Sequence, residues 1–348
     1  RDLVRSRGLG DVYKRQTKMA ARAYMAKVYL YQSKWKECLE ACDEVIQSGK
    51  YELFPDFRNV FLPENDNCSE IIFAIQLSIN DGSPNNENGS YGDRLLPPGG
   101  PYPVYGFLRP TQNLVNAYKT DVKGLPYNDG KDVSENDYVD VRLDHTLARP
   151  NIPFMDVQLY DWTPREASVY GPYSPKKRLV SLNSTYYSPI WPYVNALNFY
   201  VIRYADLLLW RAEAAIETGD LETGRKYINM IRERAKNTQH VKTMDQSQDA
   251  ANYKVGVYDE PFKSKNEAVQ ALRMERRLEM AHEGIRFFDL VRWGVADEVI
   301  NAYIAKEKVF RSHLQNAHFV KGKHEYFPIP QSMIDICGTE VMKQNPGY

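Results

Sequence analysis

The stretch ERRLEMAHEGIRFFDLVRWG, residues 275–294, carries acidic and basic side chains at helical spacing. Glu275, Glu279 and Glu283 recur every four residues, so they share one face of a predicted helix. A glycosidase needs two carboxylates that flank a sugar, one of them with a raised pKa. The arginines interspersed here instead lower carboxylate pKa values and pair with them. We therefore expect a structural salt-bridge network rather than a catalytic acid and base.

Residue types that bind metals are present without the required spacing. The cysteines and histidines fit no zinc motif: Cys38, Cys42, Cys68, Cys337, His145, His240, His282, His313, His318 and His324. Hydrolase, P-loop and dinucleotide-binding motifs are also absent from the sequence. Loops rich in Asp and Asn at 80–93 and 128–137 could bind calcium, but they lack the EF-hand frame. We expect no cofactor, with calcium as the alternative.

Aromatic residues crowd the middle of the chain, where thirteen of the 25 tyrosines fall within residues 91–200. Sugar rings pack their C–H faces on aromatic planes, while their hydroxyls need polar side chains nearby. The predicted ring platforms are the loop residues Trp162, Tyr170, Tyr173, Tyr187, Trp191 and Tyr193. The neighbouring polar candidates are Arg165, Asn183, Asp161 and Asn195. The alternative is that these rings pack the loops onto a scaffold or face a protein partner.

Hydrophobic spacing predicts the elements that position these loops. Residues 17–48 carry apolar side chains at three- and four-residue steps with a break at 32–34, which predicts a helical hairpin. Residues 203–235 repeat the pattern at an offset of 186, which aligns Ala212 with Ala26. A small residue at the same turn lets paired helices approach closely. This is the logic of tetratricopeptide (TPR) repeats.

Other segments complete the predicted architecture. The apolar, β-branched segment 69–78 predicts a strand, and 110–120 and 267–283 predict further helices. Residues 79–200 are otherwise dense in Pro, Gly, Asn and Ser, which favours loops and turns. The predicted fold class is therefore all-α, a TPR-like hairpin scaffold with long irregular loop insertions.

Charge and composition exclude several partners. Lys plus Arg and Asp plus Glu both number 45, so the basic excess typical of nucleic-acid binding is missing. No run of 18 apolar residues is present to span a bilayer. Residues 1–16, RDLVRSRGLGDVYKRQ, have no initiator Met and no signal-peptide core, and they resemble translated adapter sequence. We exclude them from the fold prediction.

Three segments carry a resemblance to a known family: NFYVIRYADLLLWRAEAAIETGD at 198–220, the opening motif at 275–294, and EYFPIPQSMIDICGTEVMKQNPGY at 325–348. In this order they resemble the SusD/RagB-like outer-membrane nutrient-binding lipoproteins. The likeness extends over residues 17–348, which are expected to form one SusD-like domain. Within it, 17–78 would hold the first hairpin and the strand, 79–200 the ligand and partner loops, and 201–348 the second hairpin and C-terminal helices.

The resemblance implies a protein without catalytic activity at the cell surface. It would capture an oligosaccharide and hand it to a SusC-like TonB-dependent transporter. Contact with the outer membrane would be through a lipid anchor that these residues do not include. Alternatives are a peptide or other nutrient bound by the same fold, or a TPR-type adaptor for another protein. An enzyme acting on glycans would need a carboxylate pair near Trp162, where Asp156, Asp161 and Glu166 are the acidic residues.

Overall fold

The computed structural model describes residues 17–96, 99–102, 105–155 and 158–348. The expectation for residues 1–16 lies outside the described residues, as does Asp156. The chain divides into two compact units, one ending at His282 and the other running from Glu283 to Tyr348. None of the helices in the described ranges has both the length and the apolar character needed to cross a bilayer.

Two helical hairpins form the frame of the first unit. They are α2 (Lys18–Tyr31) with α3 (Trp35–Gln47), and α7 (Tyr204–Glu217) with α8 (Leu221–Lys236). Three of their four helix ends correspond at the predicted offset of 186 residues (18 and 204, 31 and 217, 35 and 221), and α8 continues three residues past the equivalent of the end of α3. The prediction of two equivalent hairpins in a TPR-like, all-α fold is therefore confirmed.

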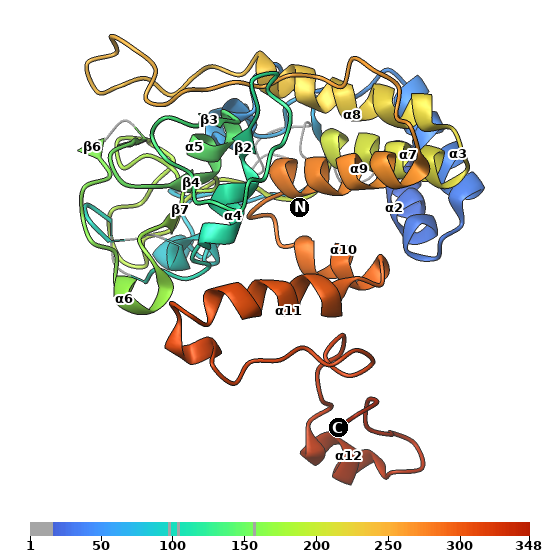
Figure 1. Ribbon diagram of the computed structural model, residues 1–348. Helices are drawn as coiled ribbons and strands as arrows, with labels where there is room; N and C mark the ends of the chain where they lie inside the picture. Colours follow the sequence, from blue (N-terminus) through green and yellow to red (C-terminus); the bar gives the residue numbers. More distant parts are fainter. Residues whose placement is uncertain (1–16, 97–98, 103–104, 156–157) are drawn as a thin grey trace. The chain divides into compact units, whose positions relative to one another are not determined.

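Small side chains allow the hairpin helices to pack closely. Ala26 in α2 and Ala212 in α7 are fully buried in the same hydrophobic cluster, as the sequence alignment of the hairpins predicted. Gly224 of α8 lies directly against α7, since a Cβ there would come within 2.4 Å of Ile216 Cγ1. In Figure 1 the helices of both hairpins gather together with α9 (Lys265–Glu279) on one side of this unit.

Helix α9 begins at the N-cap Ser264, whose side chain accepts from the Glu267 N–H at 3.2 Å, while Glu267 Oε2 reaches back to accept from the Lys263 N–H at 2.6 Å. The helix was expected at 267–283, but it ends at Glu279. Lys177 stabilises this earlier end, since its Nζ donates to the carbonyl oxygens of Glu279 and Ala281 at 2.8 and 3.1 Å.

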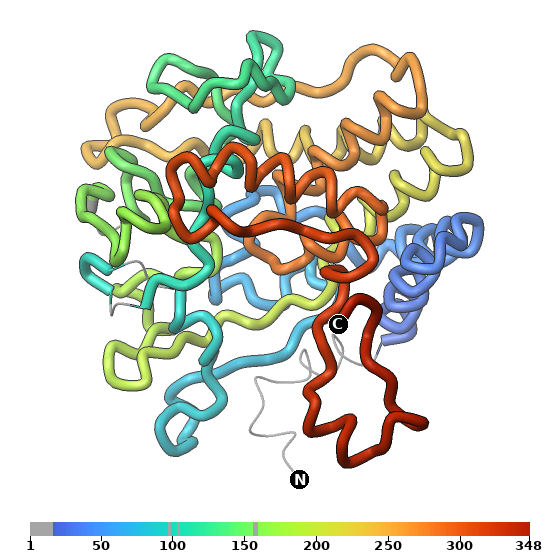
Figure 2. Tube along the Cα trace, turned by 60° about the horizontal axis from the view of Figure 1, so that its bottom comes forward, coloured from blue at the N-terminus to red at the C-terminus, as the bar shows by residue number. Residues whose placement is uncertain are grey.

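A two-stranded antiparallel sheet joins the helical frame to the loops. The predicted strand is present as β1 (Ile71–Ile75), and it pairs with β8 (Phe199–Arg203), which leads into α7. The long insertion between the hairpins therefore leaves and returns through neighbouring strands. Figure 2 shows this loop region, coloured cyan to yellow-green, to one side of the helices.

Short elements organise the loop region around three further hydrophobic clusters. The predicted helix at 110–120 is α4, which spans Gln112–Ala117. Three minimal antiparallel pairings, β2 with β3, β4 with β7 and β5 with β6, close the turns. These elements and the adjoining 3₁₀ turns are η1 (Arg58–Phe61), η2 (Pro63–Asn65), η3 (Pro84–Asn86), η4 (Asp93–Leu95), β2 (Lys119–Thr120), β3 (Tyr138–Val139), α5 (Arg142–Thr146), β4 (Leu147–Ala148), β5 (Pro153–Phe154), β6 (Gln158–Leu159), α6 (Ala167–Tyr170) and β7 (Ser174–Pro175).

The second unit contains helices and extended turns around a small core of its own. Leu290, Ala296 and Phe319 form this core, with Phe287 and Trp293 packed against it. Its elements are α10 (Arg286–Arg292), α11 (Ala296–Glu307), η5 (Ser312–Leu314) and α12 (Gln331–Cys337).

Candidate functional site

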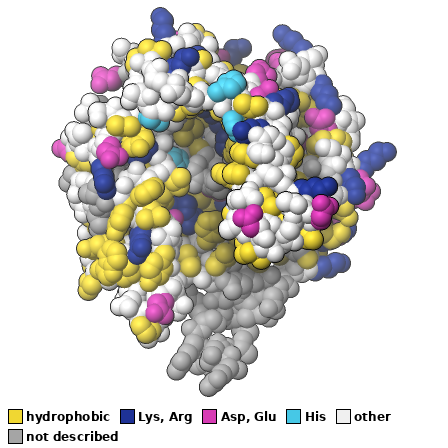
Figure 3. Space-filling model, turned by 90° about the horizontal axis from the view of Figure 1, so that it is seen from below, with side chains coloured by type: hydrophobic (Ala, Val, Ile, Leu, Met, Phe, Trp, Pro, Cys, Tyr) yellow, Lys and Arg dark blue, Asp and Glu magenta, His cyan; other side chains and the backbone are white. Residues whose placement is uncertain are grey.

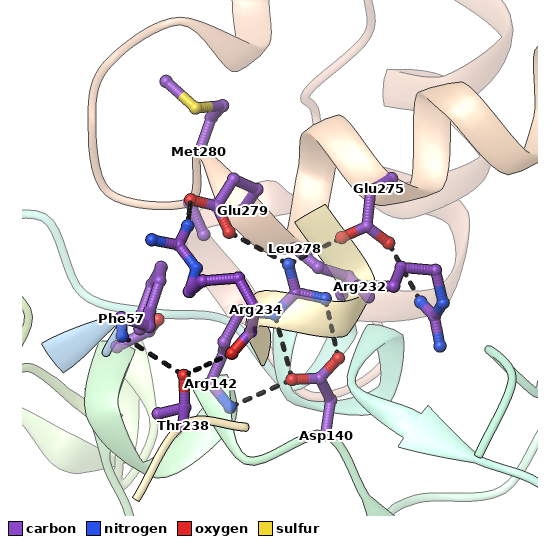
Figure 4. Close-up of polar contacts among 12 residues, drawn as sticks. Phe57, Asp140, Arg142, Arg232, Arg234, Thr238, Glu275, Leu278, Glu279 and Met280 are labelled. Carbon is purple, nitrogen blue, oxygen red and sulfur yellow. Dashed lines mark hydrogen bonds and ion pairs between the residues drawn. The ribbon is translucent and has the colours of Figure 1, made fainter. Parts of the chain in front are cut away.

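The carboxylates of α9 belong to a buried ion network. Glu275 accepts from Arg142 Nη1 at 2.6 Å and from Arg232 Nη1 at 2.9 Å (Figure 4). Glu279 accepts from Arg142 Nη1 at 3.0 Å and also pairs with Arg234. The network comprises four arginines and four carboxylates, each at most 5% exposed: Glu70, Asp140, Arg142, Arg203, Arg232, Arg234, Glu275 and Glu279.

This network cannot serve as an acid–base site. Burial alone would raise the pKa of Glu279, but the charges of Arg234, Arg203 and Arg142 overcome it and hold that pKa well below its ordinary value. A general acid needs a raised pKa and access to substrate, and Glu279 has neither. The predicted structural salt-bridge network is confirmed for Glu275 and Glu279, but the arginines described in it come from α5, α8 and the end of β8, whereas Arg276 of α9 pairs with Asp206.

Carboxylates in the two Asp- and Asn-rich loops interact with donors of the chain itself. Asp81 accepts from Ser78 Oγ at 2.5 Å. Asp129 and Asp137 contact Lys119 Nζ at 3.0 and 3.1 Å. Within the described ranges, no three or more His, Cys, Asp and Glu side chains are grouped to hold a metal ion. The calcium alternative stays a prediction.

Two of the predicted ring platforms, Trp162 and Tyr187, lie in a packed aromatic cluster. Ring centroids follow one another from Trp162 to Phe154 at 5.2 Å, on to Tyr102 at 5.7 Å and to Tyr187 at 6.0 Å. Tyr187 is only 8% exposed, so the prediction that it presents a free ring is wrong. Its segment turns inward because Tyr187 forms a β-bridge with Asn195, and burying the ring in the cluster is favourable. Trp162 is half-buried.

Arg109 fixes the loop that carries three other predicted residues. Its guanidinium donates to the carbonyl oxygens of Tyr173 and Arg165 at 2.7 and 3.1 Å. The side chains of Tyr170 and Arg165 are exposed at this loop. Tyr173 is half-buried, and its hydroxyl donates to Gln112 Oε1 at 2.6 Å. The ring of Tyr173 therefore contributes mainly to packing.

The remaining polar candidates divide by exposure. Asn183 is exposed on a turn, and Asp161 is exposed in the loop before Trp162. Asn195 is buried, and its Oδ1 accepts from the Leu197 N–H at 2.9 Å, so it is not accessible to a ligand.

Trp191 and Tyr193 are the predicted aromatic residues that the structure brings together at the surface. Trp191 is 61% exposed, and its ring lies 5.9 Å from that of Tyr193 at an interplanar angle of 88°. The Arg94 guanidinium lies 5.2 Å from the Trp191 ring centroid and 5.1 Å from that of Tyr91, which is 38% exposed. We call Tyr91, Arg94, Trp191 and Tyr193 the Arg94 platform.

Buried contacts fix the positions of the two loops that form the Arg94 platform. Asp93, next to Arg94 in η4, accepts from Arg178 Nε and Nη2 at 3.0 and 2.9 Å in a buried bidentate pair. The Ser90 N–H donates to the Asn195 carbonyl at 2.8 Å, which ties the segment before Arg94 to the segment after Trp191. The platform is thus supported from beneath by contacts distant in sequence.

Tyr91 and Arg94 were missed as site residues by the sequence reasoning. Tyr91 was counted among the mid-chain tyrosines, and Arg94 follows it within SYGDRLLPPGG. The sequence feature that could have pointed to them is a basic residue three positions after an aromatic residue in a predicted loop. Its proximity to Trp191 depends on a contact between loops about a hundred residues apart, which local patterns do not report.

The chemistry of the Arg94 platform is that of an amphipathic contact surface. Exposed rings offer flat apolar faces, and the guanidinium offers hydrogen-bond donors in their midst. The neighbouring Ile190 is also exposed, which extends the apolar area. Figure 3 shows one face of the molecule, on which apolar side chains gather most densely in one region and a basic side chain lies among them.

Comparisons with known proteins agree on one family. Residues 69–348 match the model of the SusD family. The SusD-like protein P25 of Formosa agariphila is 25% identical over 345 residues, covering 92% of this chain and 57% of that protein. A SusD superfamily protein from Bacteroides vulgatus superposes with a TM-score of 0.63 at 24% identity, covering 95% of this chain and 63% of that one.

A further solved structure, the surface glycan-binding protein A from Bacteroides fluxus, gives a TM-score of 0.60 at 23% identity and covers 93% of this chain and 61% of that one. These structural likenesses establish the fold. The chain spans less than two thirds of the length of each of these relatives.

Proposed function

Because the chain belongs to the SusD family, we propose that it is a non-catalytic protein of the bacterial cell surface that binds an oligosaccharide. It delivers this ligand to a SusC-like TonB-dependent transporter in the outer membrane. The likeness to a surface glycan-binding protein supports the ligand class. The transporter and the lipid anchor are supported by the family resemblance alone.

The Arg94 platform is the observation that carries the proposal. A sugar packs its C–H face on an exposed ring, and polar groups beside the ring take its hydroxyls. Here Trp191 supplies the more exposed ring, and the guanidinium of Arg94 lies beside it. The Tyr91 hydroxyl donates to the Asn85 carbonyl at 3.3 Å, which brings this exposed amide residue close to the second ring.

The carboxylate adjacent to Arg94 supports binding without catalysis. Glycoside hydrolysis needs two accessible carboxylates on either side of the sugar. Asp93, the carboxylate adjacent to Arg94, is buried and paired with Arg178. Near Trp162, Asp161 and Glu166 are exposed, so the alternative of an enzyme that acts on glycans is tested at these two residues. We expect Asp161→Ala and Glu166→Ala to leave glycan binding intact.

Affinity gel electrophoresis and calorimetry against a broad polysaccharide panel test the proposal. At least one glycan should bind, and no shortened products should form. Trp191→Ala should weaken binding about 5-fold, since an aromatic platform contributes about 1 kcal/mol beyond its buried area. Tyr127→Ala, which removes an exposed tyrosine outside the platform, is the matched control and should bind normally.

The alternatives give different results in the same experiments. Binding of peptides with no response to any glycan would assign a different nutrient to the same fold. Binding of a protein partner through the hairpins, unaffected by Trp191→Ala, would indicate an adaptor. Delivery is tested in cells, where loss of the partner transporter should leave labelled glycan bound at the surface without uptake.

A further inference from the structure

Arg94 carries a positive charge that no carboxylate in the described part of the chain neutralises. Its contacts there are the rings of Tyr91 and Trp191, and its Nε is buried without a hydrogen-bond partner. Arg178, which reaches the same loop, contrasts with it because it forms a bidentate pair with Asp93. The arginine held between exposed rings is therefore the unpaired one.

The carboxylates closest in sequence are engaged or remain apart from Arg94. Asp93 is committed to Arg178, and Asp81 accepts from Ser78 and Asn88 in its own turn. Glu87 is exposed and forms no ion pair among the described residues. The chain thus leaves a partly buried guanidinium without an acidic partner at the surface proposed to hold the ligand.

The stacked arrangement suits an anion. A guanidinium flanked by two rings is partly removed from water, which strengthens its attraction for a negative charge. Its in-plane N–H groups form a fork that matches carboxylate and sulfate oxygens, while the rings remain free to pack against a sugar face. A neutral glycan would use the rings and leave the charge uncompensated.

We propose that the Arg94 platform selects an acidic glycan, one that bears a carboxylate or sulfate group held by the guanidinium of Arg94. This inference rests on the proposed glycan-binding function and adds the substrate class to it. The shared chemistry is an anionic oxygen group attached to a sugar ring that packs on Trp191 or Tyr91.

The test uses a panel in which every acidic polysaccharide is paired with its own neutral form. Uronate polymers are paired with their carboxyl-reduced forms, and sulfated galactans with their desulfated forms, so the two sources of negative charge are distinguished. An acidic member should bind at least about 10-fold more tightly than its neutral form, equivalent to about 1.4 kcal/mol. Its affinity should fall as salt is raised.

Variants identify the residue responsible. Arg94→Gln should remove the preference for the acidic form, because it should weaken binding of the acidic form far more than binding of the neutral form. Arg94→Lys keeps the charge without the fork and should retain part of the preference. Lys131→Gln removes an exposed positive charge from another loop and should behave like the wild type. Thermal unfolding of each variant verifies that it is folded.

The outcomes separate this inference from the proposed function. Equal binding of acidic and neutral forms, still weakened by Trp191→Ala, would overturn the inference and leave the proposed function standing. An acidic preference that persists in Arg94→Gln would also overturn it. Absence of binding to every glycan of the panel would overturn both.

Discussion

Replacing Glu279 by Gln tests whether the buried ion network holds the first unit together. Glu279 accepts from Arg142 at 3.0 Å and from Arg203 at 3.1 Å, and it also pairs with Arg234. The substitution keeps the size of the side chain and removes one negative charge. Four buried arginines then share three carboxylates, so one positive charge in the core is uncompensated.

The expected cost follows from that imbalance. Removing one partner of a buried pair typically destabilises a protein by about 3–5 kcal/mol, because the other charge stays buried. A domain of ordinary stability has about 5–15 kcal/mol in total. Glu279→Gln should therefore remove a large part of the stability of the first unit, visible as a lower midpoint in urea with a similar slope.

The pH dependence gives a second measure of the same interaction. The folded pKa of Glu279 lies below the ordinary glutamate value of about 4.3. Its stabilising contribution is therefore complete above about pH 4.3 and is lost as the pH falls through the folded pKa. Between pH 5 and pH 3 the wild type should lose more stability than Glu279→Gln, because the variant has already lost this contribution.

Glu222→Gln is the matched control, since it breaks an exposed pair with Arg225 one turn apart on α8. Water and salt screen such a pair, so urea unfolding of this variant should match the wild type. The reasoning is refuted if Glu279→Gln unfolds within 1 kcal/mol of the wild type. Equal acid sensitivity of the wild type and Glu279→Gln would contradict the electrostatic explanation specifically.

Two further substitutions probe packing and a buried cation. Gly224→Ala should lower the free energy of unfolding by about 1–3 kcal/mol, seen as a lower urea midpoint, because overpacking against Ile216 outweighs the gain in helix propensity of about 1 kcal/mol. An unchanged or higher midpoint would contradict this expectation. Burial lowers the pKa of Lys176 to about 7, so the unfolded chain binds more protons above that pH and stability should rise from pH 7 towards pH 10. Measured as Tm, the increase in stability from pH 7 to pH 10 should be smaller in Lys176→Met than in the wild type. The same pH dependence of Tm in both proteins would contradict a lowered pKa of Lys176.

The scaffold could be predicted from sequence because its signals are local and repeated. Helical spacing and small residues identified both hairpins, and the offset aligned their helix ends. The assignment of Glu275 and Glu279 to ion pairs also followed from nearby arginines. Their actual partners come from several other elements: Arg142 from α5, Arg203 from the end of β8, and Arg232 and Arg234 from α8. They could not be named from spacing on one helix.

The loop region was less predictable because its contacts are distant in sequence. In the sequence, an aromatic residue of this region looks the same whether its ring is buried in the fold or exposed at the surface. Tyr187 becomes buried because Tyr102 lies against it, whereas Trp191, four residues later, remains at the surface beside Arg94. Hydrophobicity alone cannot separate these outcomes, because they depend on which loop arrives opposite each ring.

The positions of the charged residues suggest how stability and recognition are divided in this fold. Glu70 and Arg203 of the buried ion network stand at the ends of β1 and β8, where the long insertion leaves and rejoins the helices. The network thus fixes the base of the loops with charges that cannot change singly without a large loss of stability. Arg94 lies within the insertion, partly exposed and stacked on rings, so its replacement should cost little stability. Variation in ligand preference is therefore expected at the Arg94 platform rather than in the network.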